Sequence, residues 1–227
     1  MAHSTLSTLF YRGHALRLAI ASACCMALLL ARATWTGVDD YGFLVWNLFL
    51  AWVPLGLSSV LTRVEARGAR WPWLALLTAP WLVFLPNAPY LVTDFMHLRN
   101  HDSAPLWFDA VMLMAFAWTG LALGVSSLRA WGDVVRAGVG RRIATAFIAG
   151  AALLAAYGVY LGRFVRLNSW DVVTRPVRTL TTALAPLSHP LTLQRPWMVT
   201  IALTLLFLVA YLTTMRPTER DRPSVRR

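Results

Sequence analysis

The amino-acid sequence predicts an all-α membrane protein, a polytopic bundle of about six transmembrane helices. Hydrophobic residues make up 58% of the 227 residues and charged residues 14%, whereas a soluble domain carries about 25% charged residues. Six predominantly apolar stretches approach the roughly 20 residues that a helix needs to cross a bilayer. They are residues 15–33, 41–61, 71–95, 106–128, 143–161 and 197–215. We therefore expect residues 1–215 to form a single transmembrane domain, followed by a basic tail of residues 216–227.

The first stretch, residues 15–33, also has features of a secretory signal peptide. Arg12 and Arg17 flank the start of a short apolar core, and the Ala-Arg-Ala sequence that ends at Ala33 resembles a cleavage site. The same core can be read as a full membrane span. We favour a retained first helix, and a cleaved signal peptide stays open as the alternative.

The distribution of basic residues predicts the orientation of the helices. All 21 basic residues are arginines, and basic loops of membrane proteins lie preferentially on the cytoplasmic side. With the N-terminus inside, fourteen arginines fall in inner segments and seven in outer segments. We therefore expect both termini, including the basic tail, in the cytoplasm. Since these arginines are scattered through short loops that set topology, we expect no nucleic-acid partner.

Polar residues accompany the outer end of the second stretch, residues 41–61. Asp39 and Asp40 come just before it, where carboxylates cap and stabilise a helix N-terminus. Asn47 lies about 9 Å below the outer end of this helix, at 1.5 Å per residue. We expect the two aspartates to be caps and Asn47 to belong to a polar site on the outer side.

The third stretch, residues 71–95, is interrupted by Pro86 and Pro89. Proline lacks an N–H group and strains the preceding helical turn, and residues 71–85 cover only about 22 Å of the ~30 Å hydrocarbon core. Irregular backbone at this depth is tolerated only inside protein or beside a water-filled cavity. We therefore predict that the third helix is broken at Pro86–Pro89 and borders a polar pocket that opens outward.

A second helical segment is expected after this break, with Asn87 as its N-cap. Polar and ionisable side chains would lie on one face of it, within an arc of roughly 80°. They are Asn87, Tyr90, Asp94, His97 and His101. Asp94 and His97 could act as an acid–base pair, could hydrogen-bond each other without any chemistry, or could bind a metal together with His101. Because no HExxH-type motif or second histidine cluster accompanies them, a divalent-metal cofactor stays open but is not favoured.

The fifth stretch, residues 143–161, has small residues at the spacing that lets helices pack closely. Gly158 and Gly162 form one small-xxx-small pair, and Ala146 and Gly150 form another. In membrane helices such pairs allow the backbones of two helices to approach each other. We therefore expect this helix to pack tightly against a neighbour.

Arginines follow directly after the fifth stretch, at the expected level of Asp94. Arg163 and Arg166 are three residues apart and would share one face of a helix. We expect an ion-pair network between these arginines and Asp94, Asp109 or Asp171, since charges at a membrane boundary are usually paired. Asp109 could instead be a carboxylate favoured by the N-terminus of its own helix. The network would be either a structural clamp or part of a functional site.

The last outer loop, residues 162–196, carries arginines on the side where topology disfavours them. They are Arg163, Arg166, Arg175, Arg178 and Arg195. Either charges late in the chain matter little for orientation, or these arginines bind something anionic. Apolar residues also recur in this loop at helical spacing after Pro176, namely Val177, Leu180, Leu184 and Leu187. They predict a short amphipathic helix on the outer surface.

Two segments, FLPNAPYLVTDFMHL from Phe84 to Leu98 and LGRFVRLNSWDV from Leu161 to Val172, are long enough to be specific signatures. They resemble a bacterial integral-membrane family catalogued only as domain of unknown function number 1361. The similarity covers most of the chain, from the second to the sixth stretch. Leu167 stands where an aromatic residue is expected, and His101 falls outside the pattern, which weakens a three-ligand metal site. The resemblance implies a multi-pass protein of the bacterial envelope and supplies no established activity. We expect the protein to be integral to the bacterial cytoplasmic membrane, with the polar site facing outward.

The sequence supports three hypotheses about function. In the first, the protein binds or processes an anionic, lipid-linked substrate at the outer leaflet, with Asp94 and His97 as catalytic groups or metal ligands and arginines holding a phosphate. The residues expected to bind this substrate are Asn87, Tyr90, Arg163, Arg166, Asn168, Ser169, Trp170 and Asp171. In the second, it is a non-catalytic assembly or partner protein, and the charged network only fixes the fold.

The third hypothesis is a small-solute transporter. Broken helices with polar breaks are typical of transport sites. Against this reading, the polar residues cluster on one side, and the inner half shows no matching break or inverted repeat. In all three hypotheses membrane lipid is the expected surrounding partner.

Overall fold

The structure, a computed structural model, describes residues 2–68, 71–98, 104–188 and 194–214. These residues form helices and no β-sheet, so the predicted all-α class is confirmed. Six helices are long and apolar enough to cross a membrane, and each overlaps one of the predicted stretches. They span His14–Thr36, Phe43–Ala66, Leu74–His97, Leu106–Val139, Arg141–Arg163 and Gln194–Thr213.

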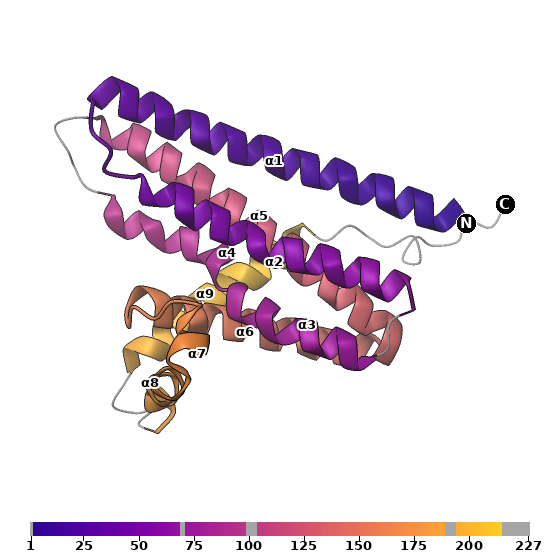
Figure 1. Ribbon diagram of the computed structural model, residues 1–227. Helices are drawn as coiled ribbons and strands as arrows, with labels where there is room; N and C mark the ends of the chain where they lie inside the picture. The colour runs from indigo at the N-terminus through magenta and orange to yellow at the C-terminus, as the bar shows by residue number, and fades with distance from the viewer. Residues whose placement is uncertain (1, 69–70, 99–103, 189–193, 215–227) are drawn as a thin grey trace.

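The helices follow one another with short connections. In chain order they are α1 (Ala2–Thr36), α2 (Phe43–Ala66), α3 (Trp71–Phe84), α4 (Asn87–Tyr90), the 3₁₀ helix η1 (Leu91–His97), α5 (Leu106–Val139), α6 (Arg141–Arg163), α7 (Asp171–Thr174), α8 (Pro176–Ser188) and α9 (Gln194–Thr213). In Figure 1, α1, α2 and α5 run side by side, whereas α7 and α8 lie beside one end of the bundle, away from α1. The expected short helix after Pro176 is α8.

The central helix of the bundle is α5. It packs against α1, α2, α4, η1, α6 and α9, so residues all around its circumference are buried. Two of its glycines let α4 approach closely. A Cβ atom on Gly120 would lie 2.5 Å from the carbonyl oxygen of Ala88, and one on Gly124 would lie 2.9 Å from the Cβ of Ala88. The short segment α4 therefore lies directly on the backbone of α5.

Buried polar side chains tie α2, α3 and α5 together. Ser58 Oγ of α2 lies 2.7 Å from Ser127 Oγ of α5, and Trp81 of α3 donates its indole N–H to the same Ser127 oxygen at 2.7 Å. Inside a bilayer such groups have no water to bond, so they must bond one another. These bonds help to fix the position of α3, and with it the position of the segment that follows.

The chain leaves regular α-helix between α3 and η1. A turn at Leu85 and Pro86 separates α3 from α4. Because Pro86 and Pro89 have no N–H group, carbonyl groups at the end of α3 need other donors. The side-chain amide of Asn87 donates to the carbonyl oxygen of Phe84 at 2.9 Å. The prediction that Asn87 caps the next segment is wrong, because Asn87 is the first residue of α4 and no side chain caps that helix.

Glycines of α6 pack against this turn. A Cβ atom on Gly158 would overlap Cγ of Pro86, and one on Gly162 would lie 3.2 Å from the ring of Tyr90. The expected close packing of this glycine pair is therefore present. The second predicted pair, Ala146 and Gly150, is exposed, and a Cβ atom on Gly150 would meet nothing within 4 Å. The prediction of close packing at this second pair is wrong, because the face of α6 that carries Ala146 and Gly150 points away from the bundle.

Candidate functional site

One end of the bundle gathers most of the residues predicted to form a site. We call it the Asp94 end. Here the C-terminal ends of α1, η1 and α6 lie with the N-terminal ends of α2, α5 and α9 (Figure 1). Side chains far apart in the sequence therefore meet at this end.

Asp94 and Arg163 form a buried ion pair at this end. Arg163 donates from Nη2 to Oδ1 of Asp94, and Asn47 donates from Nδ2 to Oδ2 of Asp94 at 3.1 Å. The side chain of Asp94 is 0% exposed and that of Arg163 is 11% exposed. A buried carboxylate needs hydrogen-bonded partners, and Arg163 and Asn47 supply one to each oxygen. The predicted ion pair between Asp94 and an arginine after the fifth stretch is thus present.

Arg163 contacts four side chains of the segment from α4 to η1. Besides its bond to Asp94, it donates from Nε to Thr93 Oγ1 at 2.8 Å, and its Nη1 lies 3.0 Å from Nε2 of His97. Its guanidinium carbon lies 4.2 Å from the ring centroid of Tyr90. Tyr90 and Thr93 are three residues apart, as are Asp94 and His97, and side chains at this spacing line up on a 3₁₀ helix. The polar face was predicted for an α-helix, but Asp94 and His97 lie on the 3₁₀ helix η1.

Arg166 does not join Arg163. The helix α6 ends at Arg163, and Arg166 has φ of 63°, in the left-handed region that residues other than glycine adopt uncommonly. The chain changes direction there, and Arg166 lines a different cavity together with Asp171. The prediction that the two arginines share a helix face is wrong, because the helix ends before it reaches Arg166.

A second buried ion pair, which the sequence reasoning missed, lies at the same end. Arg32 of α1 donates from Nε to Oδ1 of Asp109 at 2.7 Å and from Nη2 to Oδ2 at 3.3 Å. Both side chains are 1% exposed. The signal for this pair in the sequence is Arg32 itself, an arginine inside the apolar stretch of residues 15–33, which also fits the cleavage-site pattern. Asp109 thus pairs with α1 and not with the arginines that follow α6.

The two aspartates before α2 do not have the predicted role. No side chain caps the N-terminus of α2, where Gly42 is the capping residue. Asp40 lies 3.5 Å from Nη2 of Arg32 instead, and Asp39 lies against Gly42. The expected caps are therefore wrong, because Asp40 pairs with Arg32 and neither aspartate makes a capping hydrogen bond to α2.

Tyr41 lies between the two ion pairs. The guanidinium carbon of Arg32 is 4.5 Å from its ring centroid, and its hydroxyl donates to the carbonyl oxygen of His97 at 3.2 Å. Burial, aided by the negative charge of Asp109, raises the pKa of Tyr41 to about 12. Phe43 packs on the other side of this contact, with its ring centroid 4.8 Å from that of His97. The two pairs are thus joined through Tyr41 and His97.

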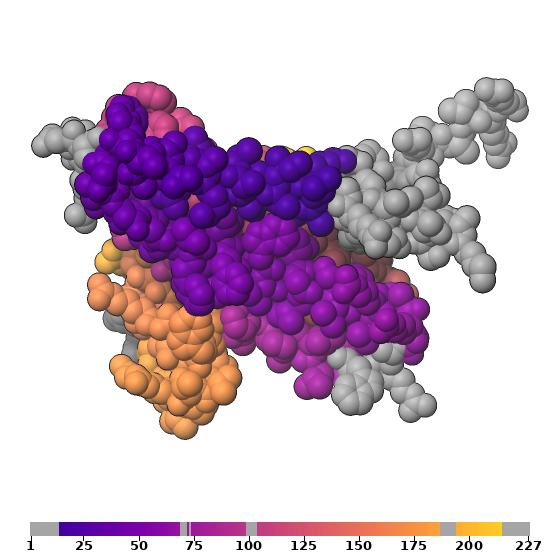
Figure 2. Space-filling model, turned by 45° about the horizontal axis from the view of Figure 1, so that its top comes forward, coloured from indigo at the N-terminus to yellow at the C-terminus, as the bar shows by residue number. Residues whose placement is uncertain are grey.

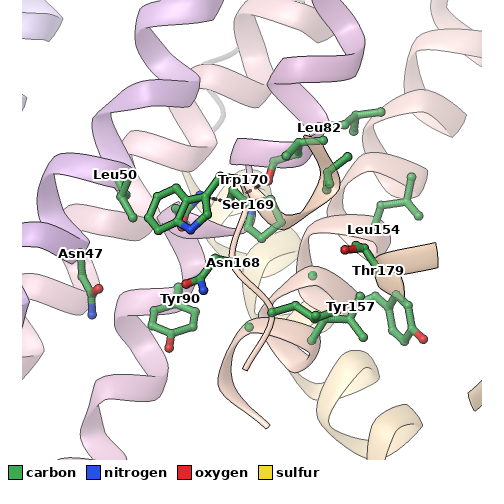
Figure 3. A pocket seen from close by; sticks show the side chains of 18 of the residues that line it. Asn47, Leu50, Leu82, Tyr90, Leu154, Tyr157, Asn168, Ser169, Trp170 and Thr179 are labelled. Atoms are coloured by element: carbon green, nitrogen blue, oxygen red, sulfur yellow. Dashed lines mark hydrogen bonds between the residues drawn. The ribbon is translucent and has the colours of Figure 1, made fainter. Parts of the chain in front are cut away.

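A cavity of about 350 Å³ lies next to the Asp94–Arg163 pair. Asn47 and Tyr90 line it and also contact the pair, so they form the wall between the charges and the cavity. Apolar residues of α2, α3 and α6 line other parts, among them Leu50, Leu82, Val83, Leu154 and Leu161. Figure 3 shows Asn47 and Leu50 on one side and Leu154 and Tyr157 on the other, with the loop of Asn168, Ser169 and Trp170 between them. The cavity therefore combines polar and apolar walls.

Most residues predicted to bind a substrate line this cavity. They are Asn87, Tyr90, Asn168, Ser169 and Trp170. Asn87 also donates from Nδ2 to Ser169 Oγ at 3.1 Å, which holds the loop after α6 against the turn after α3. Asp94, His97 and Arg163 are not part of the lining.

A smaller cavity of about 80 Å³ adjoins the first one. Arg166, Asp171, Arg175 and Arg178 line it, and it shares Leu167 and Thr179 with the larger cavity. Asp171 accepts a hydrogen bond at Oδ2 from the backbone N–H of Asn168 at 2.7 Å. Two of the predicted binding residues, Arg166 and Asp171, thus belong to this second cavity.

The predicted metal site is only partly covered by the described residues. Within residues 2–68, 71–98, 104–188 and 194–214, no group of three or more histidines, cysteines, aspartates or glutamates could hold a metal ion. His101, the third candidate ligand, lies outside the described residues, as does the tail of residues 216–227. Asp94 and His97 are both engaged by Arg163.

Comparison with protein families assigns the chain to a group. A family described as "Protein of unknown function (DUF1361)" matches residues 46–210. The chain belongs to this family. The matched region contains both cavities and the Asp94–Arg163 pair, whereas Arg32 and Tyr41 precede it. No curated protein and no solved structure matches the chain. The description of the family names no activity, so a function has to be argued from the site.

Proposed function

We propose that this protein binds a lipid-linked amphiphile, of the anionic class that the arginines of its last outer loop suggest, at the outer leaflet of the bacterial cytoplasmic membrane. The observation that carries the proposal is the mixed lining of the 350 Å³ cavity at the end of the spanning helices. An amphiphile needs polar partners for its headgroup and apolar contacts for its chain, and ligand sites typically combine the two.

The expected orientation of the helices and the tryptophans support this location. The arginine distribution favours cytoplasmic termini, which would put the Asp94 end on the outer side. Exposed tryptophans surround this end, namely Trp35, Trp46, Trp107 and Trp170. Tryptophan is enriched at the membrane–water interface, so the cavity would lie at the depth where headgroup and chain meet.

The chemistry of the polar wall favours binding over acid–base catalysis. Both oxygens of Asp94 already accept hydrogen bonds, and its charge is balanced by Arg163. In this arrangement Asp94 and His97 act as positioning residues that hold Asn47 and Tyr90 at the cavity. The catalytic role predicted for Asp94 and His97 would require this ion pair to open first.

The second hypothesis, a non-catalytic assembly or partner protein, is favoured by one specific observation. Asp94 is fully buried and tied to α2 and α6, as a clamp between helices would be. In that case the cavity would be a packing gap without a ligand. Occupancy of the cavity distinguishes the two proposals.

The test is lipid photo-crosslinking with the full chain in nanodiscs. The probe is a phosphatidic acid analogue that carries a diazirine in one acyl chain, and labelled peptides are identified by mass spectrometry. We expect labelling at the cavity that falls several-fold in Leu154→Trp, because the larger side chain fills the cavity. Leu153→Trp is the matched control, since Leu153 is exposed on the same helix and does not line the cavity. Equal labelling of the wild type and both variants would support the assembly hypothesis.

A further inference from the structure

We infer that the 80 Å³ cavity lined by Arg166, Arg175 and Arg178 binds the phosphate group of the ligand. The inference rests on the proposed function and assigns the anionic part of the ligand to residues other than Arg163. The charge of Arg163 is already balanced by Asp94. The sequence-based hypothesis treated Arg163 and Arg166 as one phosphate site, and the structure separates them.

The first argument is the uncompensated charge of the small cavity. Three guanidinium groups and one carboxylate, that of Asp171, line it. Among the described residues none of these three guanidinium groups makes a hydrogen bond or an ion pair with another side chain. Arginine binds phosphate oxygens through pairs of parallel N–H groups, and all three side chains are exposed and free to reorient around an anion.

The second argument is the backbone at Arg166. Its φ of 63° costs free energy for a residue with a side chain, and such conformations occur often where a ligand is held. This conformation turns the chain out of the direction of α6 and lets Arg166 line the same cavity as Arg175 and Arg178. If α6 continued through Arg166, this arginine would not lie with Arg175 and Arg178 at the small cavity.

The third argument is the connection with the larger cavity. Leu167 and Thr179 line both cavities, so the two spaces are neighbours. A ligand could place its polar and apolar parts in the larger cavity and its phosphate among the arginines. The size of the small cavity, about 80 Å³, is enough for several water molecules and therefore for one phosphate group.

The fourth argument is the position of α7 and α8 at the Asp94 end. In Figure 2 the residues of α7 and α8 belong to an orange lobe that stands out from the bundle. The apolar side chains of Val177, Leu180 and Leu184 are exposed on α8, as on a helix that lies in the membrane interface. A helix at that depth would hold Arg178 at the level of lipid phosphates.

The test compares two probes that differ only in the phosphate. One is the phosphatidic acid analogue described above, and the other is the diacylglycerol with the same diazirine-bearing chain. We expect the wild-type protein to be labelled about tenfold more by the phosphatidic acid probe, as one or two charge-assisted bonds would give. The triple variant Arg166→Gln, Arg175→Gln, Arg178→Gln should label equally with both probes. Its folding is not at risk, because all three side chains are exposed.

Arg195→Gln is the control for the loss of a single arginine charge outside the small cavity. Arg195 lies at the same end, over the ring of Phe164, and lines neither cavity. This variant should keep the preference for phosphatidic acid. A preference that survives in the triple variant, or that falls equally in Arg195→Gln, would overturn the inference.

A second arm distinguishes a lipid phosphate from free phosphate. Inorganic phosphate is added to the protein in nanodiscs of neutral lipid, and its binding is followed by ³¹P line broadening. Broadening that disappears in the triple variant, without any lipid preference, would assign the site to free phosphate. No binding in either arm would overturn the site altogether. Failure of the proposed function looks different, because then neither probe would respond to Leu154→Trp.

Discussion

The two buried ion pairs at the Asp94 end use the same chemistry in different surroundings. Arg32 and Asp109 join α1 to α5, and both side chains are almost completely inaccessible. Arg163 and Asp94 join α6 to η1, and the arginine keeps some exposure. The neighbours of the second pair, Asn47 and Tyr90, line a cavity, whereas Asp40 and Tyr41, which contact Arg32 of the first pair, do not.

This difference separates what each pair can do. A sealed pair has no access to a ligand and can only hold helices in place, at the cost of desolvating both charges. A pair beside a cavity can also fix the positions of side chains that face a ligand. We therefore expect Arg32–Asp109 to matter for stability, and Asp94–Arg163 to matter for stability and binding together.

Breaking the sealed pair should have the largest effect. Asp109→Asn leaves the charge of Arg32 buried, and losing one partner of a buried pair costs about 3–5 kcal/mol. We expect a large drop in the thermal unfolding temperature of the purified protein and in the yield of folded protein. The double variant Arg32→Met, Asp109→Leu is the control and should recover most of the loss, because it removes both charges. Wild-type stability of Asp109→Asn would show that the pair is not sealed in the membrane.

Breaking the pair beside the cavity should cost less stability. In Asp94→Asn the remaining charge of Arg163 is partly exposed, so we expect a loss about 1 kcal/mol smaller than in Asp109→Asn. Cavity labelling by the phosphatidic acid probe should fall at the same time, because an amide has one acceptor oxygen where the carboxylate has two, so Asn47 and Arg163 can no longer each donate to an oxygen of their own. The measurements are thermal unfolding and photo-crosslinking of the same preparations. If the folded fraction were labelled like the wild type, the second pair would be a clamp like the first.

Disturbing the packing beside the cavity should have a smaller effect again. Gly158→Ala places a methyl group against Pro86, and overpacking of this kind costs about 1–3 kcal/mol. Gly150→Ala is the matched control on the same helix, because a methyl group there meets nothing within 4 Å. Thermal unfolding should show a loss for the first variant and none for the second, since alanine favours helix over glycine. Equal stability of the two variants would mean that α6 does not rest on the turn after α3.

The smallest expected effect concerns Tyr41, which connects the two pairs. The chain has no lysine, so tyrosines dominate the titration between pH 10 and pH 12. The fold raises the pKa of Tyr41 from 10.0 to about 12, so the unfolded chain releases this proton first. Stability is therefore fully present below pH 10 and declines as the pH rises towards 12. Unfolding measured across this range should show a weaker decline in Tyr41→Phe than in the wild type, and identical slopes would contradict a buried neutral phenol.

Part of the site could be predicted from the sequence because its signals are local. Two prolines within four residues favour a departure from regular α-helix, and Asp94 and Arg163 lie at or just after the ends of the third and fifth apolar stretches. Helices that alternate in direction bring such positions to the same end. The proximity of Asp94 and Arg163 therefore followed from topology, while the roles predicted for them in binding or catalysis stay predictions.

Other parts could not be predicted because they depend on which helices become neighbours. Arg32 and Asp109 are 77 positions apart, and no local pattern says that α1 lies against α5. The position predicted for Arg166, on one helix face with Arg163, is wrong because α6 ends at Arg163 and a left-handed turn follows. The loop after this turn packs against α3 and α4, which no local pattern shows. The prediction that Asp39 and Asp40 cap α2 is wrong for the same reason, since Asp40 pairs with the buried side chain of Arg32 of α1.

Length and hydropathy are properties of each segment alone, so six apolar helices long enough to cross a membrane could be predicted from the amino-acid sequence. The two prolines of the third span likewise predicted a departure from regular α-helix, because proline acts on its own backbone. The packing of the helices was needed to show which charges pair, which glycines face a neighbour and which arginines surround a cavity. These features depend on distances between segments that no single segment encodes.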